Sequence, residues 1–192
     1  LWTIEAGFKG RLMDDRLALS ASIFRMQRRD VQNATSITRL RNDGSAEFIG
    51  YTGNGAEGVN QGVEFEAVLQ AADRFQLTAS IALLDAEFED YVNGSGEDLD
   101  GRDQAQAPGY QFYLAADYRF SQALGLNISI EGRDDYYFSD GHAEQSPSYA
   151  LVGSALRYSR ENWELSLWGR NLGDKDYFVR GFSFPNDPRD GY

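Results

Sequence analysis

Acid–base, nucleophilic and metal-centred chemistry depends on side chains that are scarce in this sequence. It contains no cysteine and a single histidine, His142, so it cannot build a thiolate metal site, a cysteine nucleophile or a histidine-rich metal site. It also has no Gly-x-Ser-x-Gly motif and no glycine-rich phosphate loop that ends in Lys-Ser or Lys-Thr. A serine hydrolase with His142 as its base is the catalytic hypothesis left, but a lone histidine in a polar segment is more often solvated surface. We therefore expect no catalytic residue, no cofactor and no metal site.

Three carboxylates in one polar segment are spaced as the ligands of hard cations sometimes are. They are Asp98, Asp100 and Asp103, within the segment EDLDGRD at 97–103. The segment lacks the rest of the calcium-loop pattern and the bidentate glutamate at its end, so a solvated loop is the favoured interpretation. With the carboxylates at 85–90 it would still make one end of the molecule acidic. Such a field disfavours anionic ligands unless basic residues counter it locally.

Aromatic residues and one arginine are concentrated near the end of the chain, in YFVRGFSFP at 177–185. In a loop, such side chains could contact a ligand by stacking and through the guanidinium group. The alternative is a short extension that packs on neighbouring loops, and we favour it. The candidate ligand-binding residues of this sequence are Asp98, Asp100, Asp103, Tyr177, Phe178, Arg180 and Phe182.

Composition excludes several classes of protein. The net charge is −12, from 30 acidic and 18 basic residues, which argues against a nucleic-acid partner because such a partner requires a basic surface. Aromatic residues make up 14% of the sequence, whereas disordered acidic chains are poor in them. No stretch of about 18 apolar residues is present, so no helix is expected to cross a membrane. A membrane-spanning β-strand needs only about 10 alternating residues.

Alternation of apolar and polar residues dominates the sequence, and this period places side chains on opposite faces of a strand. In the segment 63–69, for example, Val63, Phe65 and Leu69 fall on one face and Glu64 and Glu66 on the other. The pattern predicts eight strands, at 2–12, 16–30, 58–70, 75–91, 109–120, 124–138, 148–159 and 162–172. Near Phe24 and Met26 the pattern leaves the register open. In the seventh strand we expect Val152, Leu156 and Tyr158 on the apolar face.

Short and long connections alternate between these strands. Short turns are expected at 13–15, 71–74, 121–123 and 159–161, and long polar segments at 31–57, 92–108 and 139–147. All the short turns then lie at one end, as in the antiparallel transmembrane β-barrels of bacterial outer membranes. Aromatic residues near strand ends would form the interfacial girdle of such a barrel: Trp2, Phe75, Tyr110, Phe120, Tyr149, Tyr158 and Trp163. A soluble sandwich or barrel also alternates.

Charged residues in the middle of strands favour the membrane barrel over the soluble alternative, because its lumen is watery. We expect these side chains to line the lumen, where most would contact water or a neighbouring domain and a minority a ligand in transit. The predicted lumen-facing wall residues are Glu64, Glu66, Asp117, Arg119, Glu131, Arg133 and Arg170.

Two longer segments resemble the TonB-dependent receptors. The segment GVEFE at 62–66, followed by LTASIALLDAEF at 77–88, resembles the central hairpin of the barrels of that family. The segment WELSLWGRNLGDKDY at 163–177 resembles the family's penultimate strand and its Asn-Leu-Phe-Asp-Lys-x-Tyr ending. Gly173 departs from that motif, since an aromatic or aliphatic residue is usual there.

The resemblance implies a barrel of about twenty-two strands with a plug domain inside it and a TonB-contacting box. Residues 1–192 would be an eight-strand part of the barrel that stops in the last external loop, with the plug, the box and the last strand outside this chain. It implies uptake of a scarce ligand, driven by the TonB complex through the plug. An iron–siderophore complex is the commonest cargo of the family, and carbohydrate (an oligosaccharide), cobalamin or another metal complex are alternatives. The surroundings would be outer-membrane lipid and lipopolysaccharide. A passive porin and a barrel lipase or protease are the other functions to be weighed.

Overall fold

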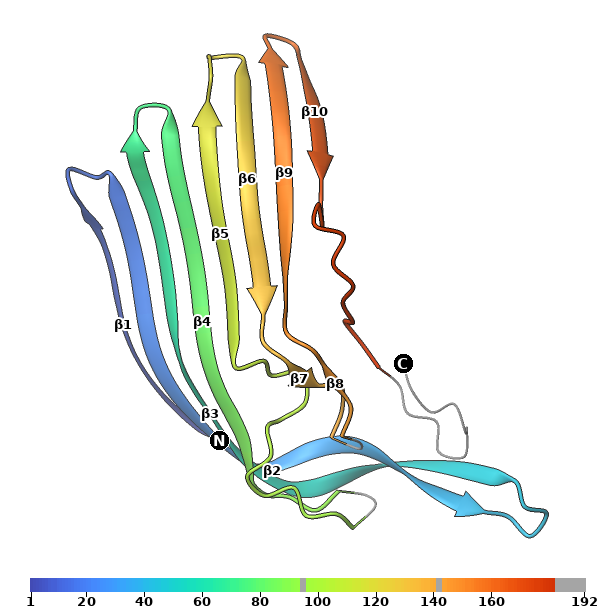
Figure 1. Cartoon of the computed structure of the whole chain (residues 1–192). Coiled ribbons are helices and arrows are strands. Elements are labelled where there is room, and N and C mark those ends of the chain that lie inside the picture. Colours follow the sequence, from blue (N-terminus) through green and yellow to red (C-terminus); the bar gives the residue numbers. More distant parts are fainter. Residues whose placement is uncertain (94–95, 141–142, 182–192) are drawn as a thin grey trace.

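The computed structural model describes residues 1–93, 96–140 and 143–181, which form a curved antiparallel sheet (Figure 1). Its eight strands are ordered β1-β2-β3-β4-β5-β6-β9-β10, so each pairs with the next main strand of the chain. They are β1 Trp2–Leu12, β2 Leu17–Leu40, β3 Ala46–Ala72, β4 Phe75–Asp90, β5 Tyr110–Arg119, β6 Leu124–Arg133, β9 Tyr149–Arg160 and β10 Trp163–Gly169. A separate two-stranded sheet, β7 (Tyr136–Tyr137) and β8 (Gln145–Ser146), lies between β6 and β9 in the chain. The predicted all-β antiparallel fold is confirmed.

The connections separate by length. Residues 13–16, 73–74, 120–123 and 161–162 make short turns at one end of the sheet, at the top of Figure 1. The longer connections lie at the other end. We call these the short-turn end and the loop end. The predicted alternation of short and long connections is therefore confirmed except at 31–57, where β2 and β3 continue instead.

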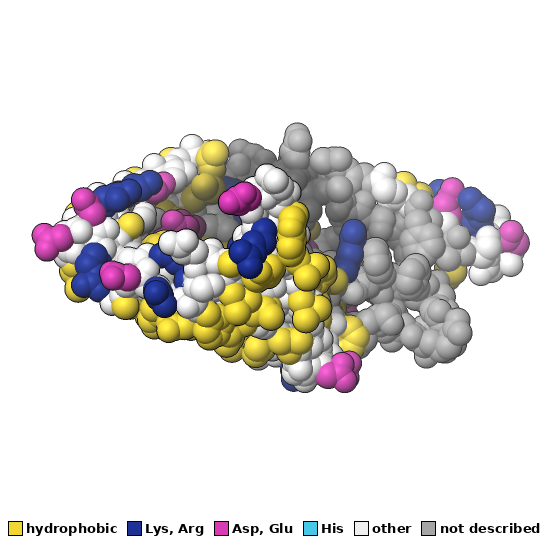
Figure 2. Space-filling model, turned by 90° about the horizontal axis from the view of Figure 1, so that it is seen from above, with side chains coloured by type: hydrophobic (Ala, Val, Ile, Leu, Met, Phe, Trp, Pro, Cys, Tyr) yellow, Lys and Arg dark blue, Asp and Glu magenta, His cyan; other side chains and the backbone are white. Residues whose placement is uncertain are grey.

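One face of the sheet is apolar across all eight strands, because the register aligns the apolar positions of neighbouring strands. Leu69, Leu77 and Ala116 face one another across β3, β4 and β5. Side chains on this face are exposed. Ile23, for example, is 59% exposed and Leu83 is 53% exposed. Figure 2 shows the hydrophobic side chains gathered along one side of the sheet. An exposed apolar surface of this extent is what a barrel wall presents to lipid.

The apolar stretch of each central strand has the length of a membrane crossing. On β4 it runs from Phe75 to Leu83, and Asp85 follows on the same face. On β5 it runs from Tyr110 to Tyr118. These stretches of about nine residues match the roughly 9–11 that a tilted strand needs to span a bilayer. In the part of the chain that the structure describes, no helix is both long enough and apolar enough to cross a membrane.

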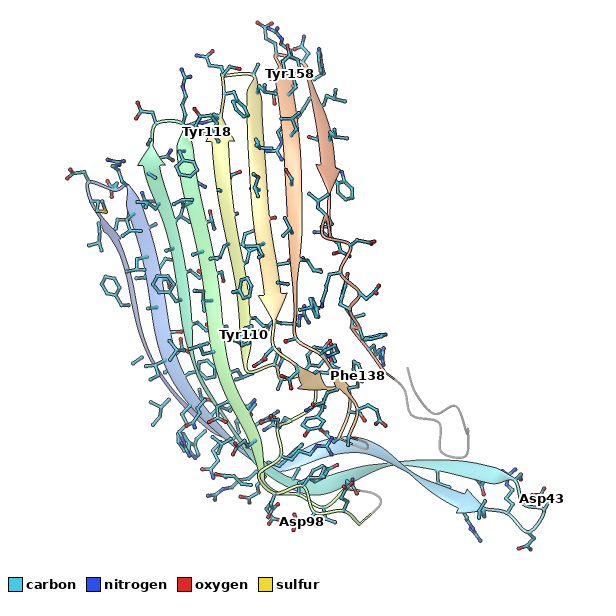
Figure 3. All side chains as sticks on the ribbon, viewed as in Figure 1. Asp43, Asp98, Tyr110, Tyr118, Phe138 and Tyr158 are labelled. Carbon is cyan, nitrogen blue, oxygen red and sulfur yellow. The ribbon has the colours of Figure 1, made fainter. Side chains whose placement is uncertain are left out.

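Aromatic rings border the apolar face. At the short-turn end, the ring centroids of Phe75 and Tyr118 are 6.3 Å apart and those of Tyr158 and Trp163 are 5.6 Å apart. Figure 3 shows Tyr118 and Tyr158 at this end and Tyr110 toward the loop end. The assignment of Tyr149 to this border is wrong. Val152, Leu156 and Tyr158 occupy the apolar face as predicted, so alternation along β9 puts Tyr149 on the other face, beside Arg133.

The predicted polar loop at 31–57 is also wrong, because β2 and β3 continue beyond the wall as a long hairpin (Figure 1). Its sequence contains β-branched and aromatic residues, in TSIT at 35–38 and EFIGYT at 47–52, which favour strands. A three-residue loop closes it: the Gly44 amide donates to the Arg41 carbonyl (3.0 Å), and Gly44 takes a φ of +81°. Register shifts near Arg28 and Glu57 mark the point where the hairpin leaves the wall.

The tip of this hairpin is fixed by one carboxylate. Asp43 Oδ1 accepts hydrogen bonds from the backbone amide and the hydroxyl of Ser45, at 2.9 and 2.6 Å. These two bonds hold the pKa of the Asp43 carboxyl below its usual value. The tip thus depends on the ionised form of this side chain.

Two further strand ends differ from the prediction, and one open register is settled. The sixth strand ends at Arg133 and the chain then forms β7 and β8, the latter within the predicted loop 139–147. The last strand ends at Gly169, because Asn171 takes a φ of +49° and turns the chain. The open register of β2 is settled: Phe24 pairs with Glu5 and Gly62, which puts it on the polar face.

Candidate functional site

The charged wall residues lie together on the face opposite the apolar one. Glu131 pairs with Tyr113, Arg133 with Gln111, and both pairs alternate with apolar neighbours that face outward. Continued alternation from β10 brings Arg170 to the same side, next to Trp168. The predicted wall residues on this polar face are Glu64, Glu66, Asp117, Arg119, Glu131, Arg133 and Arg170.

Three segments at the loop end pack into one unit, which we call the loop layer: the described residues of 91–109 (91–93 and 96–109), of 134–148 (134–140 and 143–148) and of 170–181. The first two are joined by Arg102, whose guanidinium carbon lies 4.0 Å from the centre of the Tyr137 ring and whose Nη2 donates to the Ser139 carbonyl (3.3 Å). Gln106 adds a bond from its amide nitrogen to the Phe138 carbonyl (3.0 Å).

The first segment is also fixed to the wall. Arg28 of β2 donates from Nη2 to Asn60 Oδ1 (2.9 Å) and to Gln104 Oε1. Gln104 is buried, and its amide nitrogen donates to the Glu87 carbonyl at 2.9 Å. Gly58 makes this contact possible, since a Cβ there would come within 2.7 Å of Gln104 Nε2. Leu99 completes the attachment by packing in a buried cluster with Ala56, Phe88 and Tyr91.

The third segment packs on β7 and β8. The Phe178 carbonyl accepts hydrogen bonds from the Ser146 hydroxyl (2.8 Å) and from the Tyr136 hydroxyl (3.2 Å). Ser146 is fully buried by this contact. The described part of the aromatic extension, 177–181, therefore packs on neighbouring loops, in line with the interpretation favoured from sequence.

A turn at 171–175 directs this extension. Asn171 Oδ1 accepts from the Lys175 amide (2.9 Å), and Asn171 Nδ2 donates to the Lys175 carbonyl (3.0 Å). Asn171 and Asp174 both have a φ of +49°, which asparagine and aspartate tolerate better than most residues. The chain then returns over the polar face, so that the rings of Tyr177 and Tyr149 lie 4.7 Å apart.

The two tyrosines border a hollow of about 480 Å³ on the polar face, which we call the loop-end hollow. Arg133 lines it, with its guanidinium carbon 5.5 Å from the centre of the Tyr149 ring and 6.0 Å from that of Tyr136. Among the described residues these rings are its recorded contacts and it forms no salt bridge, although Glu131 lines the same hollow. The guanidinium is thus held by cation–π contacts and keeps N–H groups available for a ligand. Gln111, Tyr113 and Glu131 also line the hollow.

The three predicted loop carboxylates shape their own loop. Asp98 Oδ1 accepts from the Asp100 amide (3.0 Å), and Asp100 Oδ1 accepts from the Tyr91 amide (2.9 Å). Asp103 lies beside Glu87 in an isolated β-bridge. Among the described residues, no group of three or more histidine, cysteine, aspartate or glutamate side chains is arranged to hold a metal ion.

Of the seven candidate ligand-binding residues, Tyr177 lines the loop-end hollow. Phe178 contributes its carbonyl to the packing on Ser146, and Arg180 follows two residues later in the chain. Phe182 and His142 lie outside the described residues. Sequence reasoning did not identify Tyr149 or Tyr136 as residues of this site. The alternation along β9 was an available signal for Tyr149, and there was no such signal for Tyr136.

These features define the class of protein. An antiparallel sheet with an exposed apolar face of membrane-crossing length, short turns at one end and long loops at the other is a segment of a transmembrane β-barrel wall. Residues 1–172 match the protein family described as TonB dependent receptor-like, beta-barrel. The chain belongs to this family of outer-membrane receptors, which are transporters and not enzymes. The passive porin and the barrel enzyme are therefore not retained.

Curated relatives and solved structures agree on the fold. The ferrioxamine receptor of Yersinia enterocolitica is 27% identical over 131 residues, covering 65% of this chain and 18% of the relative. The probable TonB-dependent siderophore receptor PiuA of Acinetobacter baumannii is 25% identical over 191 residues, 94% of this chain and 24% of its own length. A crystal structure of the siderophore receptor PiuA from Acinetobacter baumannii superimposes with a TM-score of 0.72 at 24% identity, over 93% of this chain and 25% of that one.

The fold does not specify the ligand. The copper transporter OprC superimposes with a TM-score of 0.70 at 19% identity, over 92% of this chain and 26% of that one. The chain spans 18% and 24% of the lengths of the two curated relatives. The ligand must therefore be argued from the chemistry of the polar face.

Proposed function

We propose that this chain supplies wall and external loops to a receptor that takes up an iron–siderophore complex carrying negative charge. The observation that supports the proposal is the loop-end hollow, where Arg133 has aromatic rings and no carboxylate as its recorded partners. A guanidinium without a salt-bridge partner, beside two tyrosine rings tilted at 37° to each other, suits a ligand that is both anionic and aromatic, as a catecholate complex is. The siderophore receptors among its relatives support the same class of cargo.

Energy coupling is part of the proposal. The two curated relatives are each about four times as long as this chain, since 131 aligned residues are 18% of one and 191 are 24% of the other. We infer that a plug domain, a TonB-contacting box and the remaining strands belong to the full-length receptor, and that the TonB complex drives uptake through the plug. In the membrane, lipid and lipopolysaccharide would cover the apolar face of the sheet.

Ligand binding to the full-length receptor tests the proposal. Purified receptor is titrated with a ferric catecholate, a ferric hydroxamate, a copper complex, cobalamin and a linear oligosaccharide. We expect the ferric catecholate to bind most tightly, and Arg133→Gln to weaken it about 10-fold to 100-fold, the value of one or two charge-assisted hydrogen bonds. Arg25→Gln is the matched control, because Arg25 lies toward the same end on the apolar face and donates to Gln61 (2.7 Å).

Two results would overturn this function. The first is tight binding of cobalamin or the oligosaccharide with no measurable binding of any iron complex. The second is binding of the ferric catecholate with equal affinity in Arg133→Gln, Arg25→Gln and the unchanged receptor, because Arg133 would then have no part in recognition.

A further inference from the structure

A hollow of about 610 Å³ lies on the apolar face of the sheet, which we call the border hollow. Two adjacent rows of paired residues line it, and each row crosses β1, β2, β3 and β4. The row nearer the centre of the sheet is apolar and consists of Ala6, Ile23, Val63 and Leu83. The row nearer the loop end consists of Ile4, Arg25, Gln61 and Asp85. The border hollow therefore lies where the apolar band meets its polar border.

The surroundings of the border hollow are complete in this chain. The strands at its centre are paired on both sides, β2 with β1 and β3, and β3 with β2 and β4. A further wall strand would add to the edge at β1 and not to this centre. The hollow also faces away from the lumen, where the proposed function places the plug domain. Membrane lipid is thus the molecule that meets this surface.

The polar row presents a donor and an acceptor side by side. Arg25 Nη1 donates to Gln61 Oε1 (2.7 Å), and Gln61 Nε2 donates to Asp85 Oδ2 (2.8 Å). Among the described residues Arg25 forms no salt bridge. Because a guanidinium has five N–H groups, several remain for a ligand, and the Asp85 carboxylate has further capacity to accept. A phosphorylated sugar carries the matching groups, namely a phosphate for Arg25 and a hydroxyl or amide N–H for Asp85.

The apolar row supplies the surface for a lipid chain. Val63, on β3, lies within this row and is 42% exposed. Since lipid tails are as apolar as the whole face, apolarity alone does not select one lipid. Selectivity requires a close fit of one chain together with polar contacts of its headgroup, and the border hollow combines the two. The aliphatic part of Arg25 can lie along the apolar surface while its guanidinium reaches the interface.

We propose that the border hollow binds one molecule of lipid A, the phosphorylated and acylated disaccharide that anchors lipopolysaccharide. One acyl chain lies along the apolar row, a phosphate binds Arg25 and a sugar hydroxyl or amide donates to Asp85. The long loops of outer-membrane barrels face the cell exterior, so the loop end lies in the outer leaflet, where this lipid resides. The inference goes beyond the proposed function, because the border hollow and the loop-end hollow share no lining residue.

Binding of purified bisphosphorylated lipid A to the lipid-depleted full-length receptor in detergent, followed by native mass spectrometry, is the test. We expect Arg25→Gln to lower the affinity of the tightest site at least tenfold, the value of a charge-assisted hydrogen bond. Dephosphorylated lipid A should bind weakly, and with equal affinity to the unchanged receptor and to Arg25→Gln.

A pair of matched variants tests the chain-binding part. Val63→Trp fills the border hollow and should also lower the affinity for lipid A at least tenfold. Val152→Trp is the control, because Val152 lies on the same face with a similar exposure of 38% and does not line the border hollow. Heat-modifiability gels establish that each variant forms a folded barrel.

Three outcomes would overturn the lipid site. One is equal affinity for lipid A in the unchanged receptor and in Arg25→Gln, and another is an equal loss in Val63→Trp and Val152→Trp. The third is binding of phosphatidylethanolamine as tight as that of lipid A and equally dependent on Arg25, because the occupant would then be a phospholipid. If Val63→Trp does not fold, Arg25→Gln and the two forms of lipid A decide the question. Ferric catecholate binding depends on Arg133 and not on Arg25, so failure of the lipid site leaves the proposed function standing.

Discussion

The turn at 171–175 offers a quantitative test, because Asn171 stabilises it in two separable ways: through side-chain hydrogen bonds and through its tolerance of a left-handed backbone conformation. Asn171 makes two hydrogen bonds to the Lys175 backbone, at 2.9 and 3.0 Å, and takes a left-handed φ of +49°. Hydrogen bonds of this kind contribute about 0.5–1.5 kcal/mol each. A residue with a Cβ and no local hydrogen bond costs about 1 kcal/mol more in this conformation. Asn171→Ala should therefore weaken the turn by about 2–4 kcal/mol, and Asn171→Gly by about 1 kcal/mol less.

Hydrogen exchange of the full-length receptor measures this local opening. Loss of about 2–4 kcal/mol should speed exchange of the amides at 172–181 by roughly 30-fold to 1000-fold, with the amides of β9 unchanged. Asn162→Ala in the turn before β10 is the control, since that asparagine has no recorded side-chain bond and an ordinary φ. Equal exchange rates in Asn171→Ala and Asn171→Gly would refute the conformational part of the reasoning. Unchanged rates in both would refute the hydrogen-bond part as well.

Three further predictions concern the wall and the loops. Ile128→Arg, at the centre of the apolar stretch of β6, should destabilise the folded barrel by about 2–4 kcal/mol, which heat-modifiability gels would detect. Ser129→Arg, on the polar face, should not destabilise it, and equal behaviour of the two variants would contradict the assigned faces. Gly58→Val should displace Gln104 and raise the protease sensitivity of 91–109 while the barrel stays intact. Gly125→Ala should leave the protease sensitivity unchanged, because its Cβ would come no closer than 3.7 Å to the Tyr118 carbonyl oxygen. Because the pKa of Asp43 is lowered in the folded hairpin, the tip should be ordered at pH values above the usual carboxyl pKa and should lose this order as the pH falls through the lowered pKa of Asp43. The Ser45 amide resonance reports this change, and Asp43→Asn should abolish its pH dependence.

The two faces of the wall could be predicted from the sequence because a strand has a period of two residues. Every apolar position predicted on 63–69, for example, lies on the apolar face, and Glu64 and Glu66 lie on the other. An apolar row in contact with lipid leaves no freedom for a register slip of one residue. The alternation in these strands was therefore enough to predict the face on which each side chain lies, with little information from tertiary contacts.

The hairpin at 31–57 was not predicted, for a local reason. Gly50, Gly53 and Gly55 interrupt its strand-forming residues, and glycines of this spacing also suit a loop. Pairing with a partner strand decides between the two, and a single segment does not contain that information. The tight loop at Gly44 is a signal that could have been used.

The candidate site was only partly predictable because it joins distant parts of the chain. Tyr177 meets Tyr149 after the turn that Asn171 closes, and Arg133 lies beside Tyr149 through the pairing of β6 with β9. Alternation predicts that Arg133 faces the polar side, but it says nothing of the partners that the side chain finds there. A guanidinium without a carboxylate partner is a property of three-dimensional packing.

The pairing order of the sheet also bears on how such a wall is assembled. Each main strand pairs with its neighbour in the chain, so the pairing can proceed one hairpin at a time. Arginines connect successive turns in the same order: Arg16 donates from Nε to the Gln70 carbonyl at 3.0 Å, and Arg74 donates to the Phe120 carbonyl. Each hairpin thus offers the next one both a strand edge and a positioned donor. A wall of this kind can grow hairpin by hairpin into the bilayer, with the edge of the last hairpin as the template for the one that follows.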